Sequence, residues 1–255
     1  MTIERQELEN YLNKLLSPQL FTDYGPNGLQ IEGTSSIKKI AFAVSATAES
    51  VATAVEKKAD ALIVHHGLFW RFHGPKTLTG SFAKRVMPLA KNEINLFGYH
   101  LPLDAHMTVG NAATIAKKIE LYPLEPFGDY KGSPLGVKGN FARAIKASEL
   151  QQKLEKILGH TVLLASPNED QTISSMGIIT GGANSEWELA RREGLDSYLT
   201  GEMSEHDWHE SKEAGIHMFA GGHNATESFG VQALMETISQ EFNCECFYIP
   251  SSNPA

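Results

Sequence analysis

The sequence predicts an α/β fold, and three observations support this prediction. Short apolar runs at 40–44 and 61–64 flank a helical stretch at 48–58, which makes a strand-helix-strand unit with an expected right-handed crossover. The runs are continuously apolar, as expected for strands that helices cover on both faces. The same pattern occurs again later in the chain.

The neighbouring elements follow from residue spacing and turn residues. Leucines at helical spacing predict a helix over 3–16, and the Gly, Pro and Asn-Gly content of 23–30 predicts a loop. A further helix is expected over 80–91, followed by an apolar strand over 94–99. The helix over 3–16 is expected to serve as scaffold.

The repeat pairs residues 37–66 with residues 173–202 without a gap. Its evidence is a matched order of strand, helix and strand, since few residues are identical. Further on, each copy has another apolar strand, followed by a histidine and a carboxylate four residues apart. These pairs are His100 with Asp104, and His223 with Glu227.

Residues 121–172 lie between the copies and elaborate the repeat. They contain a Gly/Pro-rich loop, a helix that we expect to begin at Ser148 with Gln151 completing a capping box, and a strand over 162–165. We therefore predict one compact unit with two halves, residues 1–126 carrying His65, His66 and Asp104, and residues 127–255 carrying His223 and Glu227.

Composition limits the classes of function. The chain of 255 residues has 42% hydrophobic residues, which is enough for a full core. Its net charge of −8 disfavours nucleic acid as a partner, because such binding depends on clustered Lys and Arg. No apolar run is long enough for a membrane helix and no signal peptide is visible, so we expect a cytoplasmic protein without a membrane partner. Cys244 and Cys246 are one residue apart and fit a reduced strand.

Two adjacent histidines are the first candidate metal ligands. His65 and His66 end the predicted strand over 61–64, and ligands of open α/β sheets bind beyond the carboxyl ends of strands. Consecutive strand side chains point to opposite faces, so two ions, each bound by one imidazole, fit better than one ion unless the strand breaks at Gly67. An isolated pair of this kind would more often be one packed and one solvated histidine.

Three further residues favour a metal site over that simpler explanation. Asp104, His223 and Glu227 also lie just beyond strand ends. Glu227 alone could be a first-turn carboxylate that complements a helix dipole, but with His223 four residues earlier it is a candidate bridging ligand. Nitrogen and oxygen donors without sulfur suit Zn, Mn, Fe, Ni or Co.

Glu202 is a candidate for the rim of the site or for proton transfer, because it occupies in the second copy the position of His66 in the first. His100 either supports the site or fills space at a strand end. His106 stays open as a residue that could reach the site. The remaining histidines are expected to be packed or solvated; they are His73, His160, His206, His209 and His217.

Five motifs in order resemble the Nif-three-like family, whose members are often labelled type 2 GTP cyclohydrolase I homologues. The similarity extends over nearly the whole chain, to the closing Ile-Pro and Asn-Pro. The motifs are Asp-Tyr-Gly-Pro-Asn-Gly-Leu-Gln at 23–30, Val-His-His-Gly at 64–67, His-Leu-Pro-Leu-Asp-Ala-His at 100–106, Thr-Gly-Glu at 200–202 and Gly-Gly-His-Asn-Ala-Thr-Glu at 221–227.

The resemblance implies a fold of two similar, interlocked α/β halves with mixed sheets, without the extra inserted domain of some members. It implies a centre of two divalent metal ions per chain, with ligands His65, His66, Asp104, His223 and Glu227. It also implies a toroidal homohexamer with the metal sites facing an internal cavity.

We therefore expect a metal-dependent hydrolase in which two ions lower the pKa of a bridging water and Glu202 or a ligand carboxylate manages the proton. The resemblance suggests a nucleotide-like small molecule or a phosphoester as substrate. No Walker-type loop is present, so phosphates would not be bound in that way. The alternative is a non-catalytic metal-binding scaffold or regulatory ring that captures a protein or nucleic-acid partner.

Overall fold

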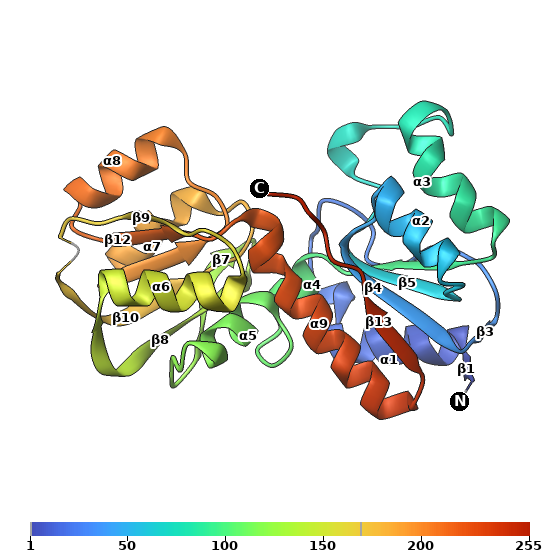
Figure 1. The fold of residues 1–255 in the computed structure, drawn as a ribbon, viewed down its shortest axis with the longest axis horizontal. Helices are drawn as coiled ribbons and strands as arrows, with labels where there is room; N and C mark the ends of the chain where they lie inside the picture. Colours follow the sequence, from blue (N-terminus) through green and yellow to red (C-terminus); the bar gives the residue numbers. More distant parts are fainter. Residues whose placement is uncertain (1, 169) are drawn as a thin grey trace. The chain divides into compact units, whose positions relative to one another are not determined.

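The computed structural model describes residues 2–168 and 170–255, which form two compact units (Figure 1). Unit 1 comprises Met1–Leu103 and Val231–Ser252, and unit 2 comprises Asp104–Gly230 and Asn253–Ala255. Each unit has its own mixed sheet covered by helices, which confirms the predicted α/β class.

The sheet of unit 1 has the strand order β13-β4-β5-β6-β2, in which β13, β4, β5 and β6 are parallel and β2 is antiparallel at the edge. A small antiparallel pair, β1 (Ile3–Glu4) with β3 (Ser36–Ile37), lies outside it. The strands of the sheet are β2 (Gly28–Ile31), β4 (Lys39–Ser45), β5 (Ala61–His66), β6 (Asn95–Gly98) and β13 (Glu245–Tyr248). Its helices are α1 (Arg5–Leu16), η1 (Pro18–Leu20), α2 (Ala48–Glu56), η2 (Arg71–His73), α3 (Gly80–Lys91), most of α4 (Leu101–Asp104) and the end of α9 (His223–Phe242).

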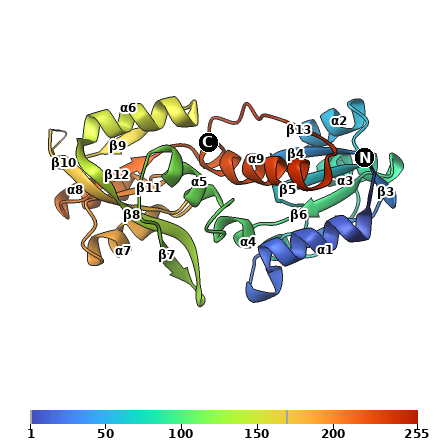
Figure 2. The same ribbon diagram turned by 90° about the horizontal axis from the view of Figure 1, so that it is seen from below.

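Side-chain alternation along the strands divides the core of unit 1 between two faces. Ala41 of β4 and Leu62 of β5 pack in one cluster with Val51 of α2 and Leu89 of α3. Figure 2 shows α1 on the opposite face of this sheet. Because helices cover both faces, β4 and β5 are continuously apolar, as the sequence predicted.

The sheet of unit 2 has the order β7-β8-β10-β11-β12-β9, with a parallel centre of β10, β11 and β12 and antiparallel neighbours. Helices α5 and α6 and the start of α9 pack on one face, and α7 packs on the other. The strands are β7 (Glu125–Tyr130), β8 (Ser133–Lys146), β9 (Leu163–Ala165), β10 (Thr172–Ile178), β11 (Ser197–Thr200) and β12 (His217–Ala220). The helices are α5 (Asn111–Lys118), α6 (Ala147–Leu158), η3 (Asn184–Glu186), α7 (Trp187–Arg192) and α8 (Glu205–Glu213).

The internal repeat is confirmed by strand register. Ile40 of β4 pairs with Ala61 of β5, and at the corresponding positions of unit 2 Met176 of β10 pairs with Ser197 of β11. An aspartate precedes the second strand in each copy and accepts two backbone amides from the start of the first strand. These hydrogen bonds run to Asp60 from Lys38 and Lys39, and to Asp196 from Ser174 and Ser175. The two copies therefore share the interaction that aligns their strands.

The division between the units differs from the predicted boundary at residue 126. Residues 104–126 belong to unit 2 because α5 contributes Ala112 and Ile115 to its core. The C-terminal strand β13 returns to unit 1, where Glu245 pairs with Lys39 of β4. Each unit is therefore built from both halves of the sequence.

The ends of two helices also differ from the prediction. Helix α1 begins at Arg5 because Ile3 and Glu4 pair with β3. Helix α6 begins at Ala147, so the predicted capping box at Ser148 is wrong, and the Gln151 side chain instead donates to the carbonyl of Val162 at 2.8 Å. Among the described residues, none of the helices has the length and apolar character needed to cross a membrane.

Asp207 stabilises the start of α8 through hydrogen bonds, and its removal should destabilise unit 2. Its carboxylate accepts hydrogen bonds from the side chains of Asn184 and Trp187 and from the amide of Ser204, at 2.9 to 3.0 Å. Burial raises the pKa of Asp207, but these hydrogen bonds and the nearby His206 outweigh burial, so the pKa lies below its ordinary value.

We expect Asp207→Asn to lower the free energy of unfolding by about 2 kcal/mol at pH 7, as for other lost hydrogen bonds to a charged group. The ionised carboxylate is stabilising above its ordinary pKa, and this contribution is lost as the pH falls through the lowered pKa, so the difference between variant and parent should shrink in acid. Urea unfolding across this pH range measures both effects. The exposed Glu210→Gln in the same helix is the control, and equal stability of the two variants would contradict the assignment.

Candidate metal centre

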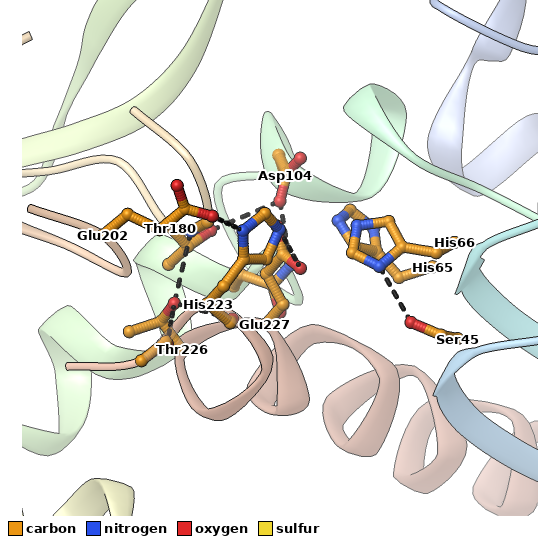
Figure 3. Close-up of polar contacts among 12 residues, drawn as sticks. Ser45, His65, His66, Asp104, Thr180, Glu202, His223, Thr226 and Glu227 are labelled. Atoms are coloured by element: carbon orange, nitrogen blue, oxygen red, sulfur yellow. Dashed lines mark hydrogen bonds and ion pairs between the residues drawn. The ribbon is translucent and has the colours of Figure 1, made fainter. Parts of the chain in front are cut away.

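The first group of donors lies in unit 1 at the carboxyl end of β5. The Nδ1 of the fully buried His65 lies 3.1 Å from the carbonyl oxygen of Tyr99. A carbonyl only accepts hydrogen bonds, so Nδ1 carries a proton, and metal ligation by His65 would use Nε2. The Nδ1 of His66 lies 3.0 Å from the hydroxyl of Ser45 (Figure 3).

Both rings belong to one cluster rather than to opposite faces of the sheet. The ring centroids of His65 and His66 are 4.6 Å apart. Pairing of β5 with β6 stops at Val64 and Gly98, so the ladder no longer enforces alternation on that side. The expectation that adjacent side chains diverge is therefore wrong at this strand end.

His100 joins this cluster, and a loop carboxylate holds it there. His65, His66 and His100 each offer a ring nitrogen within 4.8 Å of the others. The Nδ1 of His100 lies 2.7 Å from Asp23, which also accepts the amide of Leu101. Burial raises the pKa of Asp23, but its bonds to His100, Asn27 and Leu101 lower it more, so the carboxylate stays ionised. The loop at 23–30 is one of the motifs that carry the family resemblance, but the sequence indicated no role for Asp23.

The second group of donors lies in unit 2, where Asp104 ends α4. Asp104 is buried and accepts hydrogen bonds from the Asn111 amide at 2.8 Å and from the Thr180 hydroxyl at 3.4 Å (Figure 3). The other end of the Asn111 amide accepts the backbone N–H of Gly230 at 2.6 Å. One side chain of α5 thus fixes both the carboxylate and the backbone of α9.

His223 and Glu227 lie one turn apart on α9, as their spacing predicted. The Nε2 of His223 is 3.2 Å from Glu227, and its Nδ1 is 2.5 Å from Glu202 (Figure 3). Burial lowers the pKa of His223, but the hydrogen bonds and charges of Glu227 and Glu202 outweigh it and raise the pKa to about 9. Glu202, predicted for proton transfer, therefore contacts a predicted ligand.

A glycine leaves the space that Glu227 occupies. Gly181 has a φ of +71°, and a Cβ added there would lie 2.2 Å from the Glu227 carboxylate and 3.2 Å from the His223 ring. Its amide donates to the hydroxyl of Thr226 at 3.2 Å, which ties this turn to α9. Neither Gly181 nor Thr226 was singled out from the sequence, because their role depends on contacts distant along the chain.

Within each unit, the predicted ligands therefore lie close together. His65 and His66 form one group, and Asp104, His223 and Glu227 form the other. His106, which the sequence left open, uses its Nδ1 to accept the amides of Thr108 and Val109 in a turn.

The donor chemistry of both groups fits a divalent cation. In unit 2, the buried carboxylates of Asp104 and Glu227 offer oxygens within 4.8 Å of each other, an arrangement of like charges that a cation stabilises. In unit 1, the contact with Tyr99 presents His65 in the tautomer that metal ligands use. The Glu202–His223 pair has the form of a carboxylate that orients a metal-binding imidazole.

These features define a class of duplicated α/β proteins with histidine and carboxylate donors at the carboxyl ends of their central strands. The chain belongs to the family described as Duf34/NIF3 (NGG1p interacting factor 3), whose sequence model matches residues 3–254. The resemblance seen in the motifs is thereby confirmed.

The similarity to known proteins extends over nearly the whole chain. A Pasteurella multocida (strain Pm70) protein named GTP cyclohydrolase 1 type 2 homolog is 41% identical over 249 residues, which are 98% of each chain. The solved structure of a protein named ybgI, described as of unknown function, has a TM-score of 0.90 at 36% identity and covers 99% of this chain and 100% of its own. A structure from Thermus thermophilus has a TM-score of 0.89 at 32% identity, with the same coverage. The shared fold includes both units.

A methyl group at Gly181 should disrupt the second group of donors. We expect Gly181→Ala to displace Glu227 and to lower the amount of bound divalent metal at least about 10-fold, as perturbed support of metal ligands does elsewhere. Metal content by mass spectrometry after dialysis against a defined zinc concentration measures this loss.

Gly194→Ala is the matched control, because Gly194 has a similar φ of +75° and open space around its Cβ position. Both variants bear the backbone strain, and only Gly181→Ala should lose metal. Equal metal content in the two variants would contradict this role for Gly181.

Proposed function

We propose that His65, His66, Asp104, His223 and Glu227 together hold two divalent metal ions and that the chain is a metal-dependent hydrolase. The observation that carries the proposal is the pair of buried carboxylates, Asp104 and Glu227, with oxygens within 4.8 Å of each other. Such a pair is costly without a compensating positive charge, and one carboxylate can bridge two cations.

The donors favour a borderline transition metal. Imidazole nitrogen and carboxylate oxygen without thiolate suit Zn, Mn, Fe, Ni or Co. Two such ions supply Lewis acidity and lower the pKa of water to near neutral. The protein's own residues orient the donors, since Tyr99 fixes the ring of His65 and Glu202 fixes the ring of His223.

Glu202 is proposed to transfer the proton of the reaction. Its side chain is half exposed, so one carboxylate oxygen can contact His223 while the group remains accessible to solvent. Carboxylates in this position act as general bases when they lie within reach of the reacting water. Glu202 would then both position His223 and receive the proton.

The substrate is proposed to be a small nucleotide-like molecule or a phosphoester. This part of the proposal is supported by the name of the relatives, GTP cyclohydrolase 1 type 2 homolog, which links them to a purine nucleotide by similarity. We further propose, from the family resemblance, that six chains assemble into a ring.

The proposal is tested by turnover and by metal content. Protein purified without added metal should contain about two transition-metal ions per chain, by elemental analysis. After metal loading, it should hydrolyse at least one member of a panel of nucleotides, phosphoesters and cyclic amides. A His65→Ala, Glu227→Ala double variant should lose at least about 100-fold in rate, because it removes a ligand from each group of donors.

His209→Ala is the control for this experiment, since His209 is an exposed histidine on α8 that lies in neither group. It should keep both the metal and the rate. Metal binding without turnover on the panel, together with saturable binding of a protein or nucleic acid, would instead favour the scaffold.

The role of Glu202 is separable from ligand binding. We expect Glu202→Gln to keep the hydrogen bond to His223 and most of the metal, but to lower turnover about 100-fold, because the neutral amide cannot accept the proton. Rates expressed per bound ion measure this effect. The exposed Glu205→Gln is the control. If Glu202→Gln lost metal while the rate per bound ion stayed constant, Glu202 would only position His223.

A further inference from the structure

An uninterrupted cationic stretch follows the strand that carries His65 and His66. Residues 61–92 contain no Asp or Glu, although the chain as a whole has a net charge of −8. The positively charged residues of this stretch are Arg71, Lys76, Lys84, Arg85 and Lys91. The stretch itself therefore carries a positive charge, in contrast to the net charge of the whole chain.

Exposed aromatic side chains occur in the same stretch. Phe72 is 67% exposed and Phe69 is 38% exposed, and Tyr24 of the neighbouring loop is 42% exposed. Trp70 stacks on Phe72 with ring centroids 5.6 Å apart and ring planes inclined by 22°. The amide of Arg71 donates to the carbonyl of Tyr24 at 2.8 Å, which fastens the stretch to the loop at 23–30.

This aromatic group lies next to the histidines of the candidate metal centre. The ring centroid of Trp70 is 5.0 Å from that of His100 and 5.9 Å from that of His66. Trp70, His65 and His100 line a small hollow of about 10 Å³ within unit 1. A hollow of this size holds about one water molecule, so a planar ring would stack on the exposed aromatic side chains beside it.

We propose that Trp70 and Phe72 bind the planar ring of the substrate and that Arg71 and Lys76 bind its phosphate. The substrate is thereby a mononucleotide, and this inference rests on the proposed function because it assigns a subsite of the same centre. Indole and phenyl rings stack on nucleobases. Arg and Lys pair with phosphate oxygens, Arg in a bidentate manner.

A mononucleotide explains the combination of features better than a docked protein does. Exposed apolar patches commonly mark protein interfaces, but such interfaces are depleted in Lys. Here, the exposed Arg71 lies between Trp70 and Phe72 in the sequence, and the exposed Lys76 follows within the same seven residues, 70–76. Trp70, the proposed stacking residue, also lies directly beside imidazoles that can hold a metal ion.

The experiment measures binding rather than turnover, so that it remains informative if the hydrolase proposal fails. Metal-loaded protein is titrated with GMP in a calorimeter at low ionic strength, where charge pairing is least screened. Guanosine tests the ring alone, and ribose 5-phosphate tests the phosphate alone.

We expect Trp70→Leu to weaken GMP and guanosine about 10-fold, which is ~1.4 kcal/mol. We expect an Arg71→Gln, Lys76→Gln double variant to weaken GMP and ribose 5-phosphate by a similar factor, with guanosine unchanged. Trp208→Leu and Lys212→Gln are the matched controls, because this exposed aromatic and cation lie together on α8 of unit 2. They should bind all three probes as the parent does.

Several results would contradict the proposal of a mononucleotide subsite. These are no measurable binding of GMP, equal affinity of parent and Trp70→Leu, and binding of a single-stranded oligonucleotide in place of GMP. A change in molar mass by light scattering in Trp70→Leu, with GMP affinity unchanged, would assign the aromatic group to contacts between copies of the chain and would also overturn the subsite. If the two subsite variants lost affinity for GMP but no turnover were found, the proposal of a subsite would stand and the proposal of a hydrolase would be rejected.

Discussion

The close approach of two buried carboxylates in unit 2 is the constraint on which the candidate site depends. Asp104 and Glu227 come from different helices, and like charges so near each other repel in a medium of low dielectric constant. The fold holds Asp104 with the donors Asn111 and Thr180, and holds Glu227 with the contact to His223 and the space left by Gly181. A divalent cation bound between the two carboxylates would neutralise this repulsion.

The duplication explains how one architecture presents two kinds of donor. Asp60 and Asp196 fix the same strand register in the two copies, so the carboxyl ends of β5 and β11 are equivalent positions. The first copy places His66 at this end, and the second places Glu202 at the corresponding position, beyond the end of β11. An imidazole can ligate a metal directly, whereas Glu202 orients the imidazole of His223 instead. Divergence at equivalent positions thus places an imidazole in one copy and, in the other, a carboxylate that orients an imidazole.

The sequence predicted the repeated strands, the α/β class and the residue types of the site, because apolar periodicity and strand-end positions are local properties. It did not predict the partners that hold those residues. Tyr99 orients His65 through a backbone carbonyl, and Asn111 reaches both Asp104 and Gly230, which is 119 positions away in the chain. The division of the chain was also missed, because β13 pairs with β4 across nearly the whole sequence. Such long-range pairings leave no periodic signal.

The supporting hydrogen bonds give both copies the same chemical outcome by different means. A backbone carbonyl holds Nδ1 of His65 and a carboxylate holds Nδ1 of His223, so each ring directs Nε2 away from its support. The hydrogen-bond partners of the two rings differ in charge, and this difference affects the pKa of His223. Tyr99 contributes a neutral carbonyl, whereas Glu202 contributes a carboxylate. Burial lowers the pKa of His223, but the hydrogen bonds and charges of Glu227 and Glu202 outweigh burial and raise this pKa to about 9. Metal ligation needs a deprotonated ring nitrogen, so a cation at His223 would compete with the proton that the contacts with Glu227 and Glu202 favour.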